Sequence, residues 1–271
     1  MPRETKSNGR KDHLDRFYTP DNIVQKCLAL LDLTQFDCII EPSAGTGNFS
    51  KYLPNCLSYD ISPQDDDILQ ADWLTLDKSQ FIGNNILVCG NPPFGEQNTL
   101  AIKFFNESAK FCHTIAFILP LSFKKDSIQN MLDLNFHLIN ELRLDDAEFY
   151  LKDQDWIRVP CVFQVWRRTD QLRQKIKLRT TTDLFDFTTP DKADFRIQRV
   201  GGNAGKASFE LNRAVSSNYF IHNKSTLPNS DFVNYINQLI FPTIEYTVGP
   251  KSLSKGELIQ IIEENFPHLI F

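Results

Sequence analysis

A run of seven residues carries the most specific chemical pattern in this sequence. Residues 89–95 read Cys-Gly-Asn-Pro-Pro-Phe-Gly and follow the apolar run 86–89, so they are predicted to lie at the carboxyl end of a buried strand, where open α/β sheets bind ligands. The two prolines fix φ and remove two amide donors, which leaves the carbonyls of the loop to accept hydrogen bonds. The carboxamide of Asn91, the carbonyl of Pro92 and the ring of Phe94 would together suit a planar heterocyclic amine. A rigid Pro-Pro turn would explain the prolines but not the flanking Asn and Phe.

A glycine turn near residue 45 forms a second pattern. The apolar residues 39–40 run into residues 41–47, which read Glu-Pro-Ser-Ala-Gly-Thr-Gly. Glycine at 45 and 47 would let the backbone approach a ligand closely and present its amides to that ligand. Such a turn is by itself more often an ordinary tight turn, and Ser50 stands where the full dinucleotide fingerprint has its third glycine.

Acidic residues at the ends of two further runs strengthen this second pattern. Asp60 ends the apolar run 57–59, and Asp72 ends the next run, which begins with the apolar residues 68–69. A carboxylate at the tip of a second strand can accept both ribose hydroxyls of a nucleoside bound over the first turn, and Asp72 could accept from an exocyclic amine. With Glu41, three acidic strand tips surround one glycine turn, and this combination predicts a nucleoside site.

In combination, these motifs resemble those of the S-adenosylmethionine-dependent adenine-N6 methyltransferases. The shared elements are Glu-Pro-Ser-Ala-Gly-Thr-Gly, Asp60, Asp72 and Asn-Pro-Pro-Phe, and residues 17–20 (Phe-Tyr-Thr-Pro) look like that family's Thr-Pro element beside the methionine moiety. The order, with Thr-Pro first and a variable region last, is similar to the gamma class of DNA amino-methyltransferases. The resemblance covers residues 16–168. Asn-Pro-Pro-Phe alone also occurs in methyltransferases that act on RNA adenine and on protein glutamine amides.

The resemblance implies roles for individual residues. Asn91 Oδ1 and the Pro92 carbonyl would each accept one hydrogen of the target N6 amine, and Phe94 would stack on a flipped-out base. The implied catalytic residues are Asn91, Pro92, Pro93 and Phe94. The implied cofactor contacts are Tyr18, Thr19 and Pro20 at the methionine end, Glu41, Ser43, Gly45 and Gly47 beneath it, Asp60 on the ribose and Asp72 on the adenine amine.

Aromatic residues leave two alternatives open. The resemblance places a second aromatic on the flipped base within residues 145–156, where Phe149, Tyr150 and Trp156 are all candidates. Phe104 or Phe105 could wall the cofactor adenine, and core packing explains either ring equally well.

Alternating strands and helices are predicted to position these motifs on an α/β fold. Buried strands are expected at residues 38–40, 57–59, 68–69, 86–89 and 115–119, with two more at 138–144 and 161–166. Helices are expected from Thr19 as the N-cap, with Pro20 in the first position, to about residue 32, and over residues 98–111 and 126–134. Such alternation predicts a doubly wound, mostly parallel sheet, and the resemblance implies the Rossmann-like class I methyltransferase fold.

The chain changes character after residue 168. We expect a flexible tail over 1–15, an S-adenosylmethionine-binding catalytic domain over 16–168, and a smaller α+β target-recognition region over 169–271. The last region has expected strands at 195–200, 207–211 and 219–222, and a late helix with Ser254 and Glu257 at capping-box spacing. Arg196 and Arg199 could reach base edges or phosphates of a nucleic acid, and a hairpin with a flexible tip is an equal alternative for their segment.

Charge and cysteine usage exclude several classes of protein. The 271 residues hold 29 Lys and Arg against 34 Asp and Glu, a net charge of -5, which excludes a generic polyanion binder. Residues 1–168 carry 17 basic and 23 acidic side chains, whereas residues 169–271 carry 12 and 11. Six scattered cysteines without a Cys-x-x-Cys pair predict core residues of a reducing compartment and no structural metal. No run approaches the roughly 20 apolar residues of a membrane span, so a cytoplasmic protein is expected.

Three functions therefore compete. The first is methyl transfer from S-adenosylmethionine to adenine N6 in DNA, with DNA as the partner and a restriction endonuclease left open as a companion. The second keeps the chemistry and changes the substrate to RNA adenine or a protein glutamine. The third is a methyltransferase-like binding subunit without activity, which the intact Asn-Pro-Pro-Phe and both glycines of the turn argue against.

Overall fold

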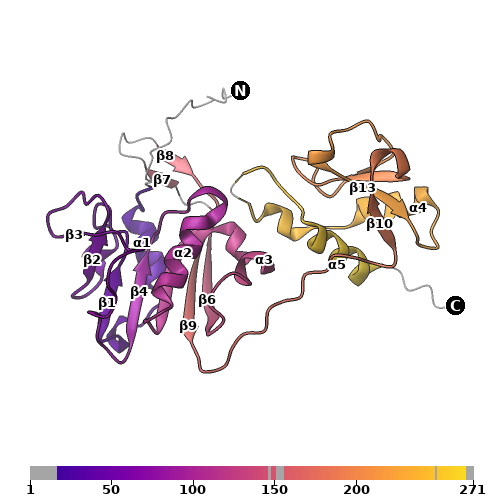
Figure 1. Ribbon diagram of the computed structural model, residues 1–271. Coiled ribbons are helices and arrows are strands. Elements are labelled where there is room, and N and C mark those ends of the chain that lie inside the picture. Colours follow the sequence, from indigo (N-terminus) through magenta and orange to yellow (C-terminus); the bar gives the residue numbers. More distant parts are fainter. Residues whose placement is uncertain (1–16, 146–147, 151–155, 248, 267–271) are drawn as a thin grey trace. The chain divides into compact units, whose positions relative to one another are not determined.

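The computed structural model describes residues 17–145, 148–150, 156–247 and 249–266. The chain divides into two compact units (Figure 1). The first unit contains the chain up to Pro120 together with Met131–Gln174, and the second contains Leu121–Asn130 together with Lys175–Phe271. The expected tail over 1–15 lies outside the described residues.

A seven-stranded mixed sheet organises the first unit, in the order β3-β2-β1-β4-β5-β9-β6. Strands β3 to β5 of this order pair in parallel, and β9 is antiparallel to both of its neighbours. The order 3-2-1-4-5 is that of a doubly wound Rossmann-like sheet, so the expected α/β fold is confirmed. The strands are β1 (Cys38–Glu41), β2 (Leu57–Asp60), β3 (Leu69–Gln70), β4 (Ile86–Gly90), β5 (Thr114–Pro120), β6 (Phe136–Leu144) and β9 (Cys161–Arg168).

The central strands β4 and β5 are buried along their whole length. A strand covered on both faces loses the alternation of apolar and polar residues and reads as one apolar run, which is why the sequence pattern located these two so closely. Aromatic packing fills the space beside them, where Phe105 makes edge contacts with Phe136 and Trp166 at centroid distances of 5.7 and 5.5 Å.

The helices of the first unit are shorter than expected. Helix α1 spans Asp21–Leu28 with Pro20 at its N-cap, so the predicted Thr19 cap and the extension to residue 32 are wrong. The N-cap falls on Pro20, whose backbone is extended and whose carbonyl accepts from the amides of Ile23 and Val24. Helix α2 spans Thr99–Ser108, and it cannot start at Asn98 because that residue has a left-handed backbone with φ of 66°.

A small hairpin attaches to the segment before α1. Strands β7 (Glu148–Tyr150) and β8 (Trp156–Arg158) pair antiparallel. Tyr150 bridges Tyr18 through two backbone hydrogen bonds, of 2.9 and 3.1 Å. Segment 145–156, expected as a loop between two strands, is therefore in part a hairpin. Its residues 146–147 and 151–155 lie outside the described part of the chain.

The second unit is α+β, as expected. Its antiparallel sheet has the order β10-β13-β11-β12, and α4 (Asn229–Gln238) and α5 (Lys255–Asn265) supply helices to the same unit. Its core includes Phe185, Phe195, Phe232 and Leu258. The strands are β10 (Phe185–Thr188), which the sequence pattern missed, β11 (Phe195–Gln198), β12 (Ala207–Ser208) and β13 (Asn218–Asn223).

The division between the units differs from the expected one in two places. Arg173 donates from Nε to the Phe136 carbonyl and stacks on Trp166, so the first unit continues to Gln174 rather than ending at 168. The segment Leu121–Asn130 joins the second unit and contains α3 (Asp126–Gln129), only four residues of the predicted helix 126–134. Lys125 Nζ lies 3.2 Å from Glu257 Oε1 and holds that segment in place.

Among the described residues, no helix is both long and apolar enough to cross a membrane.

The capping box of α5 is confirmed, and it makes a stability prediction. Ser254 Oγ accepts from the Glu257 amide, and the Glu257 carboxylate accepts from the Ser254 amide. Ser254→Ala should lower the free energy of unfolding by about 1 kcal/mol, because one end-of-helix donor loses its partner. Urea denaturation of the full chain measures this loss. The exposed Ser216→Ala should leave stability unchanged, and equal losses in both variants would contradict the assignment.

Candidate functional site

A cavity lies where the strand order of the first sheet reverses, between β1 and β4. Chains leave these two adjacent strands in opposite directions, which opens a crevice outside their carboxyl ends. The empty volume there is about 1140 Å³, part of it open to solvent. The predicted site residues that line it are Tyr18, Thr19, Ser43, Gly45, Asp60, Asp72, Asn91, Pro92, Pro93 and Phe94.

Other predicted site residues do not line this cavity. Pro20, Glu41 and Gly47 lie next to lining residues in the chain, Trp156 lies on the hairpin, and Arg196 and Arg199 belong to the second unit. Phe104 lines the cavity whereas Phe105 is fully buried in the core, so Phe104 is the ring that could wall a bound adenine. Sequence reasoning missed Asn48, Trp73 and Leu100, which also line it.

Two glycines allow close packing at the carboxyl ends of β1 and β4. One ends β4, and the other lies in the turn that follows β1. Gly90 ends β4 with φ of 150°, and a Cβ there would come within 3.2 Å of Glu41 Cγ. Gly45 has φ of 57°, and a Cβ there would meet the ring of Tyr18 at 3.1 Å. A side chain at either position would strain the backbone, because φ is positive, and would also have to displace its neighbour by a few tenths of an ångström.

The Asp60 carboxylate is hydrogen-bonded to the backbone of the glycine turn. Its Oδ2 accepts from the Gly45 amide and its Oδ1 from the Ser62 amide, each at 2.8 Å. A carboxylate has about four acceptor positions, so these two bonds orient the group and leave it able to accept from a ligand's hydroxyls. Asp72 is exposed, and its Oδ1 accepts from the Leu74 amide at 2.9 Å.

Asn91 donates both hydrogens of its carboxamide to the segment before α1. Its Nδ2 lies 3.1 Å from the Phe17 carbonyl oxygen and 3.1 Å from Thr19 Oγ1. Because a carbonyl oxygen can only accept, the carboxamide nitrogen must face Phe17, and Oδ1 is left as the acceptor of the group. The next carbonyl in the chain belongs to Pro92 and is bonded to the nitrogen of Pro93, so neither residue of this pair offers an amide donor.

Phe94 forms an apolar wall of the cavity. Its side chain is 9% exposed, and its carbonyl accepts from the Leu100 amide at 3.2 Å and the Ala101 amide at 3.3 Å. These two bonds hold the backbone of Phe94 against the start of α2, and this fixes the point from which its ring projects. Gly95 permits this turn with φ of 69°.

The three aromatic candidates of residues 145–156 have different surroundings. Phe149 is 1% exposed and belongs to the core, which removes it as a base contact. Tyr150 stacks on Tyr18 at a centroid distance of 5.3 Å. Trp156 is 59% exposed and lies 5.5 Å from the Tyr150 ring, so its contact with a base stays a prediction.

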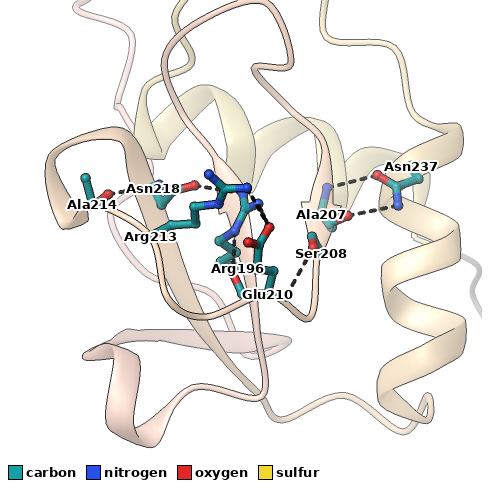
Figure 2. A network of polar contacts seen from close by, with 8 residues as sticks. All are labelled: Arg196, Ala207, Ser208, Glu210, Arg213, Ala214, Asn218 and Asn237. Atoms are coloured by element: carbon teal, nitrogen blue, oxygen red, sulfur yellow. Dashed lines mark hydrogen bonds and ion pairs between the residues drawn. The ribbon is translucent and has the colours of Figure 1, made fainter.

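Arg196 is not available to a base edge (Figure 2), and this part of the sequence prediction is wrong. Its side chain is buried, Nη1 donates to Asn218 Oδ1 at 2.9 Å, and Nε donates to the Glu210 carbonyl at 2.7 Å. The guanidinium links β11 to its neighbours and is a structural group of the second unit. Arg199 is half-buried, donates to the Ser216 carbonyl at 3.0 Å and lies over the ring of Tyr219, so its contact with nucleic acid stays a prediction.

Among the described residues, no group of three His, Cys, Asp or Glu side chains lies close enough to hold a metal ion.

Glu41 is a buried acid directly beneath the site. It is 2% exposed, and its Oε2 has no hydrogen-bond partner among the described residues. Burial raises the pKa of Glu41 to about 8, and the charge of Asp60 adds to this while hydrogen bonds from Ser50 oppose it. The group is therefore held mainly as the neutral acid at pH 7.

This raised pKa predicts a pH dependence of stability. Between pH 4.5 and about 8 the folded chain keeps a proton that the unfolded chain releases, so Glu41 makes the free energy of unfolding fall as pH rises through that window. In Glu41→Gln this fall should disappear, so the variant should gain stability relative to the unmodified protein at pH 8 more than at pH 5. Urea denaturation at both pH values measures it. The exposed Glu96→Gln serves as the control, and an unchanged pH slope in Glu41→Gln would refute the neutral acid.

No protein-family model matches this chain. A curated relative from Arabidopsis thaliana, Protein ENHANCED DOWNY MILDEW 2, is 27% identical over 160 residues, which are 49% of this chain and 12% of the relative. The chain therefore spans about an eighth of the length of the curated relative that it matches.

Several solved structures are similar to part of this chain. A Pyrococcus horikoshii protein described as a candidate RNA methyltransferase has 16% identity and a TM-score of 0.45, over 59% of this chain and 90% of that one. A candidate class I S-adenosylmethionine-dependent methyltransferase from Listeria monocytogenes has 15% identity and a TM-score of 0.43, over 62% and 66%. The 23S rRNA methyltransferase ErmE has 13% identity and a TM-score of 0.40, over 58% and 71%.

Proposed function

We propose that this protein transfers a methyl group from S-adenosylmethionine to the exocyclic N6 amine of adenine in a nucleic acid, with DNA as the first substrate. The observation that carries the proposal is the orientation of the Asn91 carboxamide. Because both of its hydrogens are donated to residues 17–19, its oxygen is the group that can accept a hydrogen from a bound amine. The Pro92 carbonyl beside it supplies a second acceptor, and an N6 amine has two hydrogens.

The described residues fit the cofactor. Asp60 is oriented by two backbone amides and keeps acceptor positions for the ribose hydroxyls, and Asp72 lies at the same cavity for the adenine amine. Phe104 and Trp73 supply apolar walls of the size that an adenine ring needs. When bound, S-adenosylmethionine supplies an electrophilic methyl group on a sulfonium.

The protein's contribution to transfer is positioning and electrostatic stabilisation. The lone pair of N6 is delocalised into the adenine ring, so the amine is a poor nucleophile. When Asn91 Oδ1 and the Pro92 carbonyl accept its two hydrogens, the nitrogen becomes more tetrahedral, and positive charge that develops on it is stabilised by two fixed acceptors. Phe94 would stack on the base, which contributes about 1–3 kcal/mol without selecting adenine.

The second unit supports DNA as the substrate only in part. It is a compact α+β unit next in the chain to the proposed catalytic unit, as a recognition domain would be. Several of its basic side chains are already paired with acids, in Arg179–Glu263, Arg213–Glu210, Lys224–Asp186 and Lys251–Glu245. This pairing reduces the positive charge that the unit can offer to the phosphates of a DNA duplex. It therefore favours RNA adenine as the second candidate, because RNA targets are read mostly in single strands.

Removal of the Asn91 acceptor tests the transfer directly. Asn91→Ala should reduce methyl transfer by about 100-fold or more, as loss of one pre-organised group at a developing charge does. The measurement is incorporation of labelled methyl from S-adenosylmethionine into separate pools of DNA, RNA and protein. Asn84→Ala, an exposed asparagine outside the cavity, is the matched control. Full activity of Asn91→Ala would exclude the proposed mechanism, and labelling of RNA or protein alone would replace DNA as the substrate.

Asp60 tests the cofactor independently of the substrate. Asp60→Asn should weaken S-adenosylmethionine binding by about 10- to 100-fold, because a charged acceptor of hydrogen bonds is lost. Isothermal titration calorimetry measures the dissociation constant, with the exposed Asp66→Asn as control. No binding by the unmodified protein would favour a subunit without activity, and equal affinity in both variants would remove Asp60 from the site.

A further inference from the structure

A chain of side-chain hydrogen bonds connects the β7–β8 hairpin to Asn91. Asn48 Nδ2 donates to the Tyr150 hydroxyl and to the Thr19 carbonyl, each at 2.7 Å. Thr19 Oγ1 in turn accepts from Asn91 Nδ2 at 3.1 Å. All four residues lie in the first unit, although they come from four separate parts of its chain.

The Phe17 carbonyl selects the orientation of the Asn91 carboxamide, and the chain through Thr19 and Asn48 holds that orientation in place. A half-turn about its Cβ–Cγ bond would place Oδ1 against the Phe17 carbonyl, where two acceptors repel, and would direct the NH₂ group toward the cavity. A donor in that place cannot accept a hydrogen from an amine. Thr19 is 3% exposed and supplies the second partner of Nδ2, and the bond from Asn48 to its carbonyl keeps that segment in place.

We propose that Thr19 and Asn48 are positioning residues, which hold the Asn91 carboxamide with its oxygen directed to the target amine, and that the Tyr150 hydroxyl extends this control to the hairpin. The proposal rests on the proposed function and deepens it. It also differs from the role that the sequence resemblance implies for Thr19, which is contact with the methionine end of the cofactor. The two roles separate in kinetics, because orientation of Asn91 affects the transition state more than cofactor binding.

Thr19→Val and Thr19→Ser form the central pair of variants. Valine has the shape of threonine but no hydroxyl, whereas serine keeps the hydroxyl. In Thr19→Val, kcat should fall about 10-fold, the size expected for one hydrogen bond lost in the transition state, while KM and the dissociation constant of S-adenosylmethionine change by less than about 2-fold. Thr19→Ser should restore kcat to within about 3-fold of the unmodified protein. A rise in the cofactor dissociation constant that accounts for the whole loss in Thr19→Val would overturn the proposal and restore the cofactor role.

Nuclear magnetic resonance tests the hydrogen bond without any activity. The side-chain amide pair of Asn91 is identified by its loss in Asn91→Ala. In Thr19→Val one of its protons should shift and exchange faster with water, and in Thr19→Ser the pair should resemble that of the unmodified protein. An unchanged pair in Thr19→Val would overturn the proposal. Because this readout needs no substrate, an unmodified protein that methylates nothing would refute the proposed function while the positioning contact is still decided.

Tyr150→Phe tests the link to the hairpin. It removes the hydroxyl that accepts from Asn48 and leaves the residues that line the cavity unchanged. We expect kcat to fall by about 3-fold, less than in Thr19→Val, because the bond lost is one step further from Asn91. An unchanged kcat would overturn the extension to Tyr150.

Discussion

The donation of both Asn91 amide hydrogens to residues 17–19 is the interaction on which the rest of the site depends. It joins the Asn91 side chain to partners that lie 74 and 72 positions away in the chain, and it determines which end of the carboxamide a ligand meets. Thr19 directs its hydroxyl to Asn91, and α1 begins after Pro20, at Asp21, without a side-chain cap.

The central sheet makes this interaction available. Parallel strands bring their carboxyl ends to one edge, and the reversal between β1 and β4 opens the crevice in which Asp60, Asn91 and Phe94 meet. Close packing there has a cost. Gly90 is needed because Glu41 lies against it, and Glu41 is itself buried as a mainly neutral acid with one unpartnered oxygen. A buried polar atom without a partner among the described residues is typical of a functional site rather than of a core.

The second unit shows how far a sequence motif can mislead. Arg196 stands in a basic, glycine-containing stretch that is typical of a nucleic-acid contact, yet its guanidinium is buried against Asn218 and Glu210 (Figure 2). An arginine offers five donors in a rigid fork, and a small unit with short strands such as β12 can use those donors to join its segments. Exposure and partners decide between these uses, and neither is visible in the order of residues.

Local sequence patterns are sufficient to predict the α/β class, the strands β1, β4 and β5, the capping box of α5, and ten of the residues that line the cavity. These follow from local causes, because burial on both faces leaves continuous apolar runs, and strand ends carry their motifs with them. The fold alone sets the partners of Asn91, the participation of Asn48, the choice of Phe104 over Phe105, the burial of Arg196, and the assignment of Leu121–Asn130 to the second unit. Each of these depends on contacts between distant segments, and such contacts leave no periodic trace in the chain.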